Sequence, residues 1–231
     1  MSARAIRAAA WPLLLIAAAV LAQNDAPDAR ARAPIDLEGD WVSVVSEDWR
    51  WRLVTPAKGD YASVPLNAAG EQAADGWEPD ADESSCLPYG APSVLRVPTR
   101  LRIRWADENT LRIETEAGAQ TRVLAFSAPV AAAASRQGRS SARWDGSALE
   151  VQTSNLLPGF LRRNGVPYSG SAELSEYFNT HGAYGDDGFT VTTIVRDPVY
   201  LREEFVTSST FLRLPEGSAW QPTPCVEPAE S

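Results

Sequence analysis

The chain has 231 residues, of which 44% are hydrophobic, and this is enough for one domain with a buried core. It carries 21 Lys and Arg against 30 Asp and Glu, a formal charge of −9. This acidity argues against nucleic acid and anionic lipid as partners, because both are bound through clustered Lys and Arg.

The first 22 residues have the features of a secretory signal peptide. Arg4 and Arg7 form a positive start, a short apolar run follows, and small residues lead up to a cleavage position after Ala22. A retained signal anchor is the alternative, although the run is short and rich in Ala for a membrane span. We expect a mature chain of 209 residues (231 minus 22) that is periplasmic or secreted and does not contact the membrane after cleavage.

The sequence predicts that the mature chain begins with a disordered segment, which is followed by short strands. Residues 23–34 are polar and contain two prolines, so we expect them to be disordered. Further on, eight segments rich in Val, Ile, Thr, Trp and Phe alternate apolar and polar residues, the pattern of strands. They are 41–46, 48–54, 100–105, 110–116, 121–126, 148–154, 189–195 and 203–214.

Helical pattern is confined to two places. Residues 66–77 could form one short helix, and 171–179 fits either a helical turn or a strand. The sequence therefore predicts one all-β domain over 35–231, a lipocalin-like antiparallel β-barrel with short helical insertions and an irregular insertion at about 56–98.

Several predicted strands have an apolar face and an arginine-rich face. Arg50 and Arg52 alternate with tryptophans, and Arg102 and Arg104 alternate with Leu, Ile and Trp. We expect the apolar face to be buried and the arginines to form solvated cross-strand pairs. An arginine-lined anion pocket is the alternative, since a barrel that binds a ligand can hold polar groups inside.

The chain has two cysteines, Cys86 and Cys225. An even pair in an oxidising compartment predicts one disulfide, which would join the C-terminal tail to the first third of the chain. Two free thiols are the alternative.

Two patterns resemble known families. Gly39-x-Trp41 resembles the start signature of lipocalins, in which the Trp closes one end of the barrel; a turn glycine before a core Trp is the alternative. A longer pattern runs through Cys86-x-x-x-Gly90-x-Pro92, Trp144-x-Gly146-x-x-Leu149-x-Val151-x-Thr153 and Asp197-Pro198. It resembles a large family of exported bacterial proteins without an assigned function, and implies a β-rich exported domain but no particular chemistry.

The stretch Trp144-Asp145-Gly146 raises the question of a catalytic corner. Gly146 permits the positive φ of a tight turn, and Asp145 can bond nearby backbone N–H groups. Alternating residues follow directly. A hairpin corner with Trp144 packed as a lid accounts for all of these residues, so we favour it over a catalytic corner.

A serine triad, a metal site and a nucleotide site find little support in the sequence. His181 is the only histidine; it lies in a Gly-rich loop with Asp186 and Asp187, and an exposed loop side chain is the favoured interpretation. One His and two distant cysteines lack the close ligand spacing of zinc sites, and no phosphate-binding glycine motif is present. We expect no metal and no cofactor.

Polar side chains in the second half form the candidate ligand-binding site. A carboxyl among apolar neighbours is favoured in its protonated form, which suits acid–base work, and Glu176 has such neighbours. A wet edge or an ion pair with Arg163 is the alternative for Glu176. The candidates for ligand binding are Trp144, Asn155, Arg163, Asn164, Tyr168, Ser169 and Glu176, and those for catalysis are Glu176, Tyr168 and Asp145.

Three functions follow from this sequence. The favoured one is an exported protein that binds a small apolar or amphipathic ligand inside the barrel, with Trp side chains lining it. A cofactor-free isomerase, lyase or hydrolase and an envelope interaction module without a pocket are the alternatives. A closed pocket above about 300 Å³ would favour ligand binding, converging carboxyls the enzyme, and a filled barrel the module.

Overall fold

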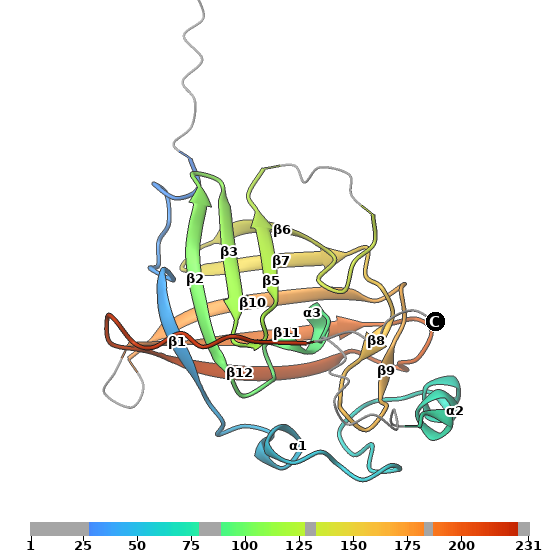
Figure 1. The fold of residues 1–231 in the computed structure, drawn as a ribbon. Helices are drawn as coiled ribbons and strands as arrows, with labels where there is room; N and C mark the ends of the chain where they lie inside the picture. Colours follow the sequence, from blue (N-terminus) through green and yellow to red (C-terminus); the bar gives the residue numbers. More distant parts are fainter. Residues whose placement is uncertain (1–27, 79–88, 128–132, 183–186, 226–231) are drawn as a thin grey trace, which may run out of the picture.

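The computed structural model describes residues 28–78, 89–127, 133–182 and 187–225. Nine strands close into a barrel, which confirms the all-β prediction (Figure 1). They are β1 (Gly39–Val44), β2 (Arg100–Asp107), β3 (Thr110–Thr115), β5 (Thr121–Ala125), β6 (Arg139–Asp145), β7 (Ala148–Ser154), β10 (Glu173–His181), β11 (Gly188–Arg196) and β12 (Phe205–Arg213).

The order around the barrel is β1-β12-β11-β10-β7-β6-β5-β3-β2, and β2 returns to β1. All neighbours are antiparallel except β5 and β6, which run parallel where Leu124 pairs with Ser140. The barrel is therefore mixed, whereas the sequence predicted an antiparallel one. In Figure 1, β2, β3 and β5 stand upright while β7, β10, β11 and β12 lie across them.

Short elements cover one end of the barrel. They are α1 (Trp49–Leu53), α2 (Ala68–Gly76), α3 (Ala91–Val94), β8 (Gly159–Phe160) and β9 (Pro167–Tyr168), while β4 (Ala117–Gly118) and β13 (Thr223–Pro224) pair separately. The helix expected within 66–77 is present, and its N-cap Asn67 accepts from the Gly70 N–H. In the described part of the chain, no helix has the length and apolar character to cross a membrane.

The strand predicted over 48–54 is wrong, because this segment contains α1. Alternation over five residues cannot separate a strand from a single helical turn. Tertiary contacts favour the helical turn here. Arg52 donates from Nε to the Arg96 carbonyl at 2.8 Å. Asp48, the N-cap residue with a φ of 51°, accepts from Arg96 at 2.9 Å. These bonds turn Arg52 inward and leave Trp49 exposed.

Three further segments differ from the sequence-based predictions or settle what these left open. Residues 171–179 contain strand β10 and no helix, and β6 is a strand that the sequence analysis missed. Residues 28–34, placed in a disordered lead-in, instead lie against the barrel. Ala29 is fully buried, its N–H donates to Asn109, and its carbonyl accepts from Trp144 Nε1 at 2.8 Å.

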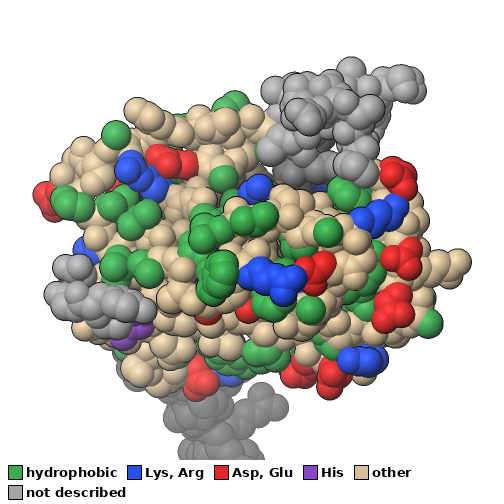
Figure 2. All heavy atoms as spheres, turned by 90° about the horizontal axis from the view of Figure 1, so that it is seen from below, with side chains coloured by type: hydrophobic (Ala, Val, Ile, Leu, Met, Phe, Trp, Pro, Cys, Tyr) green, Lys and Arg blue, Asp and Glu red, His purple; other side chains and the backbone are tan. Residues whose placement is uncertain are grey.

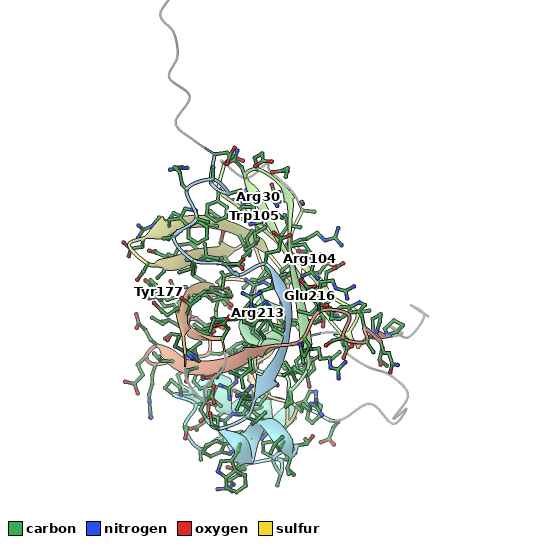
Figure 3. The ribbon with its side chains drawn as sticks, turned by 90° about the vertical axis from the view of Figure 1, so that its left-hand side faces the viewer. Arg30, Arg104, Trp105, Tyr177, Arg213 and Glu216 are labelled. Carbon is green, nitrogen blue, oxygen red and sulfur yellow. The ribbon has the colours of Figure 1, made fainter. Side chains whose placement is uncertain are left out.

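Inward-facing side chains fill the barrel with an apolar core. Its buried members include Trp41, Leu101, Ile103, Leu111, Ile113, Leu149, Val151, Phe178, Phe189 and Phe211. Trp41 packs edge-on against Phe189 with ring centroids 4.7 Å apart, and the Arg213 guanidinium lies 4.3 Å from the Trp41 ring centroid. Figure 3, viewed from the left of Figure 1, labels Arg213 near the centre of the barrel end that Trp41 and Arg213 close.

The signal segment and Cys86 lie outside the described residues, so the disulfide stays a prediction. Cys225 and Tyr89, the first described residue after Cys86, are both held near β4. β13, just before Cys225, pairs with β4, and Gln120 close behind β4 accepts from the Tyr89 N–H at 3.0 Å. Tyr89 is three residues beyond Cys86.

Mutation of Cys225 to Ser should lower the free energy of unfolding of the oxidised protein by about 2–4 kcal/mol, because a disulfide restricts the unfolded chain. Urea denaturation with and without reductant measures this. The reduced wild type and the variant should then unfold alike. Two titratable thiols in the unreduced, denatured wild type would rule out the bond.

Candidate functional site

The polar residues predicted from the sequence do not meet at one site. Glu176 projects from β10 into the barrel and binds Arg122 of β5, with Oε1 2.9 Å from Nη1 and Oε2 2.6 Å from Nη2. Both side chains are buried. The ion pair with Arg163 that the sequence left open is therefore wrong. Arg122 also reaches Thr153, which bonds Ser140, so the pair belongs to a polar layer inside the barrel.

Tyr168 lies on β9 in the small β8–β9 hairpin, and its hydroxyl makes no hydrogen bond to Glu176. It is fully buried, and a Cβ atom at Gly159 would lie 2.6 Å from its hydroxyl oxygen. This hydroxyl has no acceptor or donor within the described residues, and burial raises the pKa of Tyr168 to about 12. Asp145 is at the exposed end of the β6–β7 hairpin. The three catalytic candidates are thus on three separate parts of the fold.

Two other predicted residues hold loops in place. Ser169 donates from N and Oγ to the two carboxylate oxygens of Asp197, at 2.6 and 2.7 Å. Asn164 donates to the carbonyls of Ala57 and Asp60, both at 3.0 Å, and so fixes the loop before α2. The described contacts give both residues a structural role, although Oδ1 of Asn164 has no partner among the described residues.

The β6–β7 hairpin answers the question raised by Trp144-Asp145-Gly146. Asp145 pairs with Ala148 across the turn, and Gly146 has a φ of 57°. Trp144 packs against Phe126 with ring centroids 5.0 Å apart, and Figure 3 labels its other ring neighbour, Trp105. The hairpin interpretation is confirmed, and Trp144 is a packed wall residue.

His181 and Asn155 complete the predicted set. His181 ends β10, and its Nε2 lies 3.0 Å from the hydroxyl of Thr190. Asn155 follows β7 with a φ of 60°, a conformation that Asn adopts more readily than most residues. Among the residues that the structure describes, no three His, Cys, Asp or Glu side chains group as metal ligands do.

A cluster of arginines at the covered end of the barrel does form a site. Arg52 comes from α1, Arg96 follows α3, and Arg162 and Arg163 lie in the turn between β8 and β9. Arg52, Arg96 and Arg162 are only 6%, 6% and 3% exposed. A cavity of about 30 Å³ lies among these four arginines, and we call it the arginine cavity.

Local structure sets the position of each guanidinium group. Leu161 donates its N–H to the Val166 carbonyl at 2.7 Å, which closes the turn, and Trp77 packs on Gly165, where φ is +85°. A side chain on Gly165 would strike Trp77. Arg162 then stacks on Trp51 from α1, with 4.7 Å between Cζ and the ring centroid.

Several buried donors at the arginine cavity have no protein acceptor. Arg162 uses Nη1 for the Ala62 carbonyl at 2.6 Å, but its Nε and Nη2 have no acceptor among the described residues. The same holds for Nη2 of Arg52 and Nε1 of Trp51. Buried charged donors are normally hydrogen-bonded, so this group is the least satisfied part of the fold.

The charges around the arginine cavity are unbalanced. Among the described residues, three carboxylates lie near its four guanidinium groups: Asp48 at 2.9 Å from Arg96, Glu47 at 3.5 Å from Arg52, and Asp60, which acts on Arg162 through its charge. Burial, and secondarily the charge of Arg96, lower the pKa of Arg162 to about 10. Burial also lowers the pKa of Arg52, while Glu47 acts in the opposite direction. At neutral pH the site remains cationic, within an acidic protein.

Two larger hollows, of about 520 and 500 Å³, lie at the opposite end of the barrel around Arg213. Polar groups there already bind one another. Arg213 donates to the carbonyls of Glu38 and Asp36, and Asp40 accepts from Arg102 and Arg104. The hydrogen bond from Arg102, with the charge of Arg104, lowers the pKa of Asp40 despite partial burial. Size alone therefore does not make these hollows the better site.

Sequence reasoning placed Arg163 and Arg52 on candidate faces but missed Arg96 and Arg162. The available signal was the Arg162-Arg163 pair beside Asn164-Gly165, two cations in a turn. Comparison with family models, curated proteins and solved structures yields no match, so the site is interpreted from its own chemistry.

Proposed function

We propose that the protein is an exported binding protein whose arginine cavity receives the anionic group of a small ligand, a carboxylate or a phosphate. The observation that carries this proposal is the set of buried guanidinium and indole donors that have no acceptor in the described part of the chain. An unmade buried hydrogen bond costs about 1–3 kcal/mol, and more when the donor is charged. An oxyanion offers acceptors and charge together, and a planar guanidinium binds carboxylate or phosphate through two parallel bonds.

The size of the arginine cavity fits this class of ligand group. It measures about 30 Å³, and one ordered water needs about 10–15 Å³ on the same scale. The space thus suits a few oxygen atoms and not a whole metabolite. The rest of a ligand would extend past Arg163, which is exposed and stacks 5.7 Å from the Tyr89 ring centroid.

The other functions considered have less support. Large side chains fill the described barrel interior, which disfavours an apolar ligand inside it. The candidate acid–base residues Glu176, Tyr168 and Asp145 occupy separate places, which disfavours an enzyme that uses them together. An interaction module without a ligand would not explain why buried arginine donors lack acceptors among the described residues.

Calorimetric titration of the mature protein with sulfate, inorganic phosphate and acetate tests the proposal. We expect one site per chain. At a ligand concentration of 100 times Kd, the gain in stability should be about 2.7 kcal/mol, a rise in Tm of roughly 5–10 °C for a chain of this size. Mutation of Arg112 to Met, which removes an exposed arginine paired with Glu114, is the control and should leave binding intact. No heat and no Tm shift with any anion would refute the proposal.

Sulfate affinity should depend on pH in one direction. The charge of sulfate does not change over this pH range, so a change in its affinity reflects the titration of groups on the protein. Arg162 is protonated below its pKa of about 10 and loses its proton as the pH rises through that value. Affinity should therefore be constant between about pH 6 and 8.5 and fall above about pH 10. A loss of affinity near pH 6.5 would instead indicate binding near His181, at the opposite end of the barrel, and would contradict the assignment to the arginine cavity.

A further inference from the structure

Helix α1, which lines the arginine cavity, also carries an exposed apolar surface. Trp49, Leu53 and Val54 are 61%, 58% and 66% exposed, and together we call them the α1 patch. The same short stretch supplies Trp51 and Arg52 to the wall of the arginine cavity. Figure 2 shows the molecule from below, the side on which α1 lies in Figure 1, and hydrophobic side chains gather near the middle of this face.

The α1 patch differs from the other exposed apolar residues. Trp49 and Leu53 are four residues apart on one helix, so they share a face, and Val54 follows directly. Val123 and Val206, by contrast, are single exposed residues on β5 and β12. Isolated exposed apolar residues need no explanation, whereas a contiguous set beside a binding site indicates an interaction surface.

We infer that the anionic group is the phosphate of a membrane phospholipid and that the α1 patch inserts into the bilayer surface beside it. This inference rests on the proposed function, because it names the source of the oxyanion. A phospholipid places a phosphate next to acyl chains, and this chain places cationic donors next to exposed Trp, Leu and Val. Trp is favoured at the boundary between headgroups and acyl chains. Short apolar surfaces with adjacent cations bind membrane interfaces.

The acidity of the whole chain led to the expectation of no membrane partner, but the charge near α1 is different. Among the described residues, Asp48 pairs with Arg96, Glu47 lies near Arg52, and Asp60 adds a negative charge near Arg162, so the four arginines outnumber the nearby carboxylates. Fields between exposed charges are screened within about 8 Å at physiological salt. The local cationic site therefore governs contact with a headgroup, while the distant acidic residues weaken long-range attraction.

Co-sedimentation with vesicles of phosphatidylethanolamine and phosphatidylglycerol tests the inference on the mature full-length protein. The wild type should bind. The double variant Trp49→Ser/Leu53→Ser should lower the partition coefficient at least tenfold, and Arg162→Met should do the same. Val123→Ser, which removes an exposed apolar residue (52%) from β5, is the control and should bind like wild type. Excess inorganic phosphate should displace the wild type. Circular dichroism confirms that each variant is folded, and Val54→Ser serves in place of the double variant if that protein is unstable.

The outcomes separate this inference from the proposed function. If sulfate and phosphate bind in solution but vesicles do not, the membrane inference is overturned and the anion site stands. If vesicles bind equally well after Arg162→Met, the phosphate role is overturned. If sedimentation velocity finds a dimer that Leu53→Ser dissociates, and vesicles do not bind, the α1 patch is covered by a second copy and the inference fails.

Discussion

Replacing Glu176 by Gln lowers the free energy of unfolding by about 3–5 kcal/mol, because it leaves the Arg122 guanidinium buried without its counter-charge. The carboxylate makes both of its bonds, 2.9 and 2.6 Å, to this one side chain. Glu176 is fully buried, so water cannot replace the lost partner. Urea denaturation at neutral pH measures the loss.

Two further variants serve as controls for the loss of stability in Glu176→Gln. Glu114→Gln breaks the exposed pair with Arg112 and should change stability by less than about 1 kcal/mol. The double variant Arg122→Met/Glu176→Met removes both charges and should recover much of the stability lost by Glu176→Gln. Sulfate affinity should be unchanged in all three proteins. Near-wild-type stability of Glu176→Gln, together with weakened ligand binding, would show that Glu176 serves a ligand and not the fold.

Replacing Arg162 by Met should weaken sulfate binding roughly 100-fold, since two charge-assisted hydrogen bonds contribute about 3 kcal/mol together. Nε and Nη2 of Arg162 are the donors lost. The stability of the ligand-free protein should fall little, because Met still packs on Trp51 and Phe205, and because removal of two buried donors without described acceptors offsets loss of the bond from Nη1 to the Ala62 carbonyl. Calorimetry gives the affinity and urea denaturation the stability.

Substitutions of two of the buried arginines, Arg122 and Arg162, are thus expected to have opposite effects. Arg122 is paired within the chain, and breaking its pair affects stability alone. Arg162 is unpaired at two atoms, and its removal affects binding alone. A large loss of stability in Arg162→Met would assign Arg162 to the fold and withdraw it from the site. Arg112→Met controls for the removal of one positive charge.

The barrel could be predicted from the sequence because strand alternation is a local signal. Leu101 and Ile103 are buried and Arg102 and Arg104 lie on the outer side with Asp40, as the alternation predicts. The parallel β5–β6 pair could not be predicted, since it depends on how the chain between Ala125 and Arg139 crosses.

The site was less accessible to sequence reasoning because its parts come from three distant segments. Arg52, Arg96 and Arg162 meet only after α1, α3 and the β8–β9 turn are packed on the end of the barrel. Glu176 was recognised from the sequence, but its role was not. Its apolar neighbours were recognised, but its partner Arg122 is 54 positions away, beyond any local pattern.

The pairing of β1 with β12 fixes when the barrel can form. Val44 pairs with Thr210, and Arg213 bonds the Glu38 carbonyl 175 positions earlier in the chain. Contacts of such sequence separation slow folding, because the loop must close before they form. A chain emerging in order from a ribosome or a translocation channel cannot complete this barrel until its last long strand is free. β12 joins β1 to β11, so we expect the barrel to close only after β12 has been released.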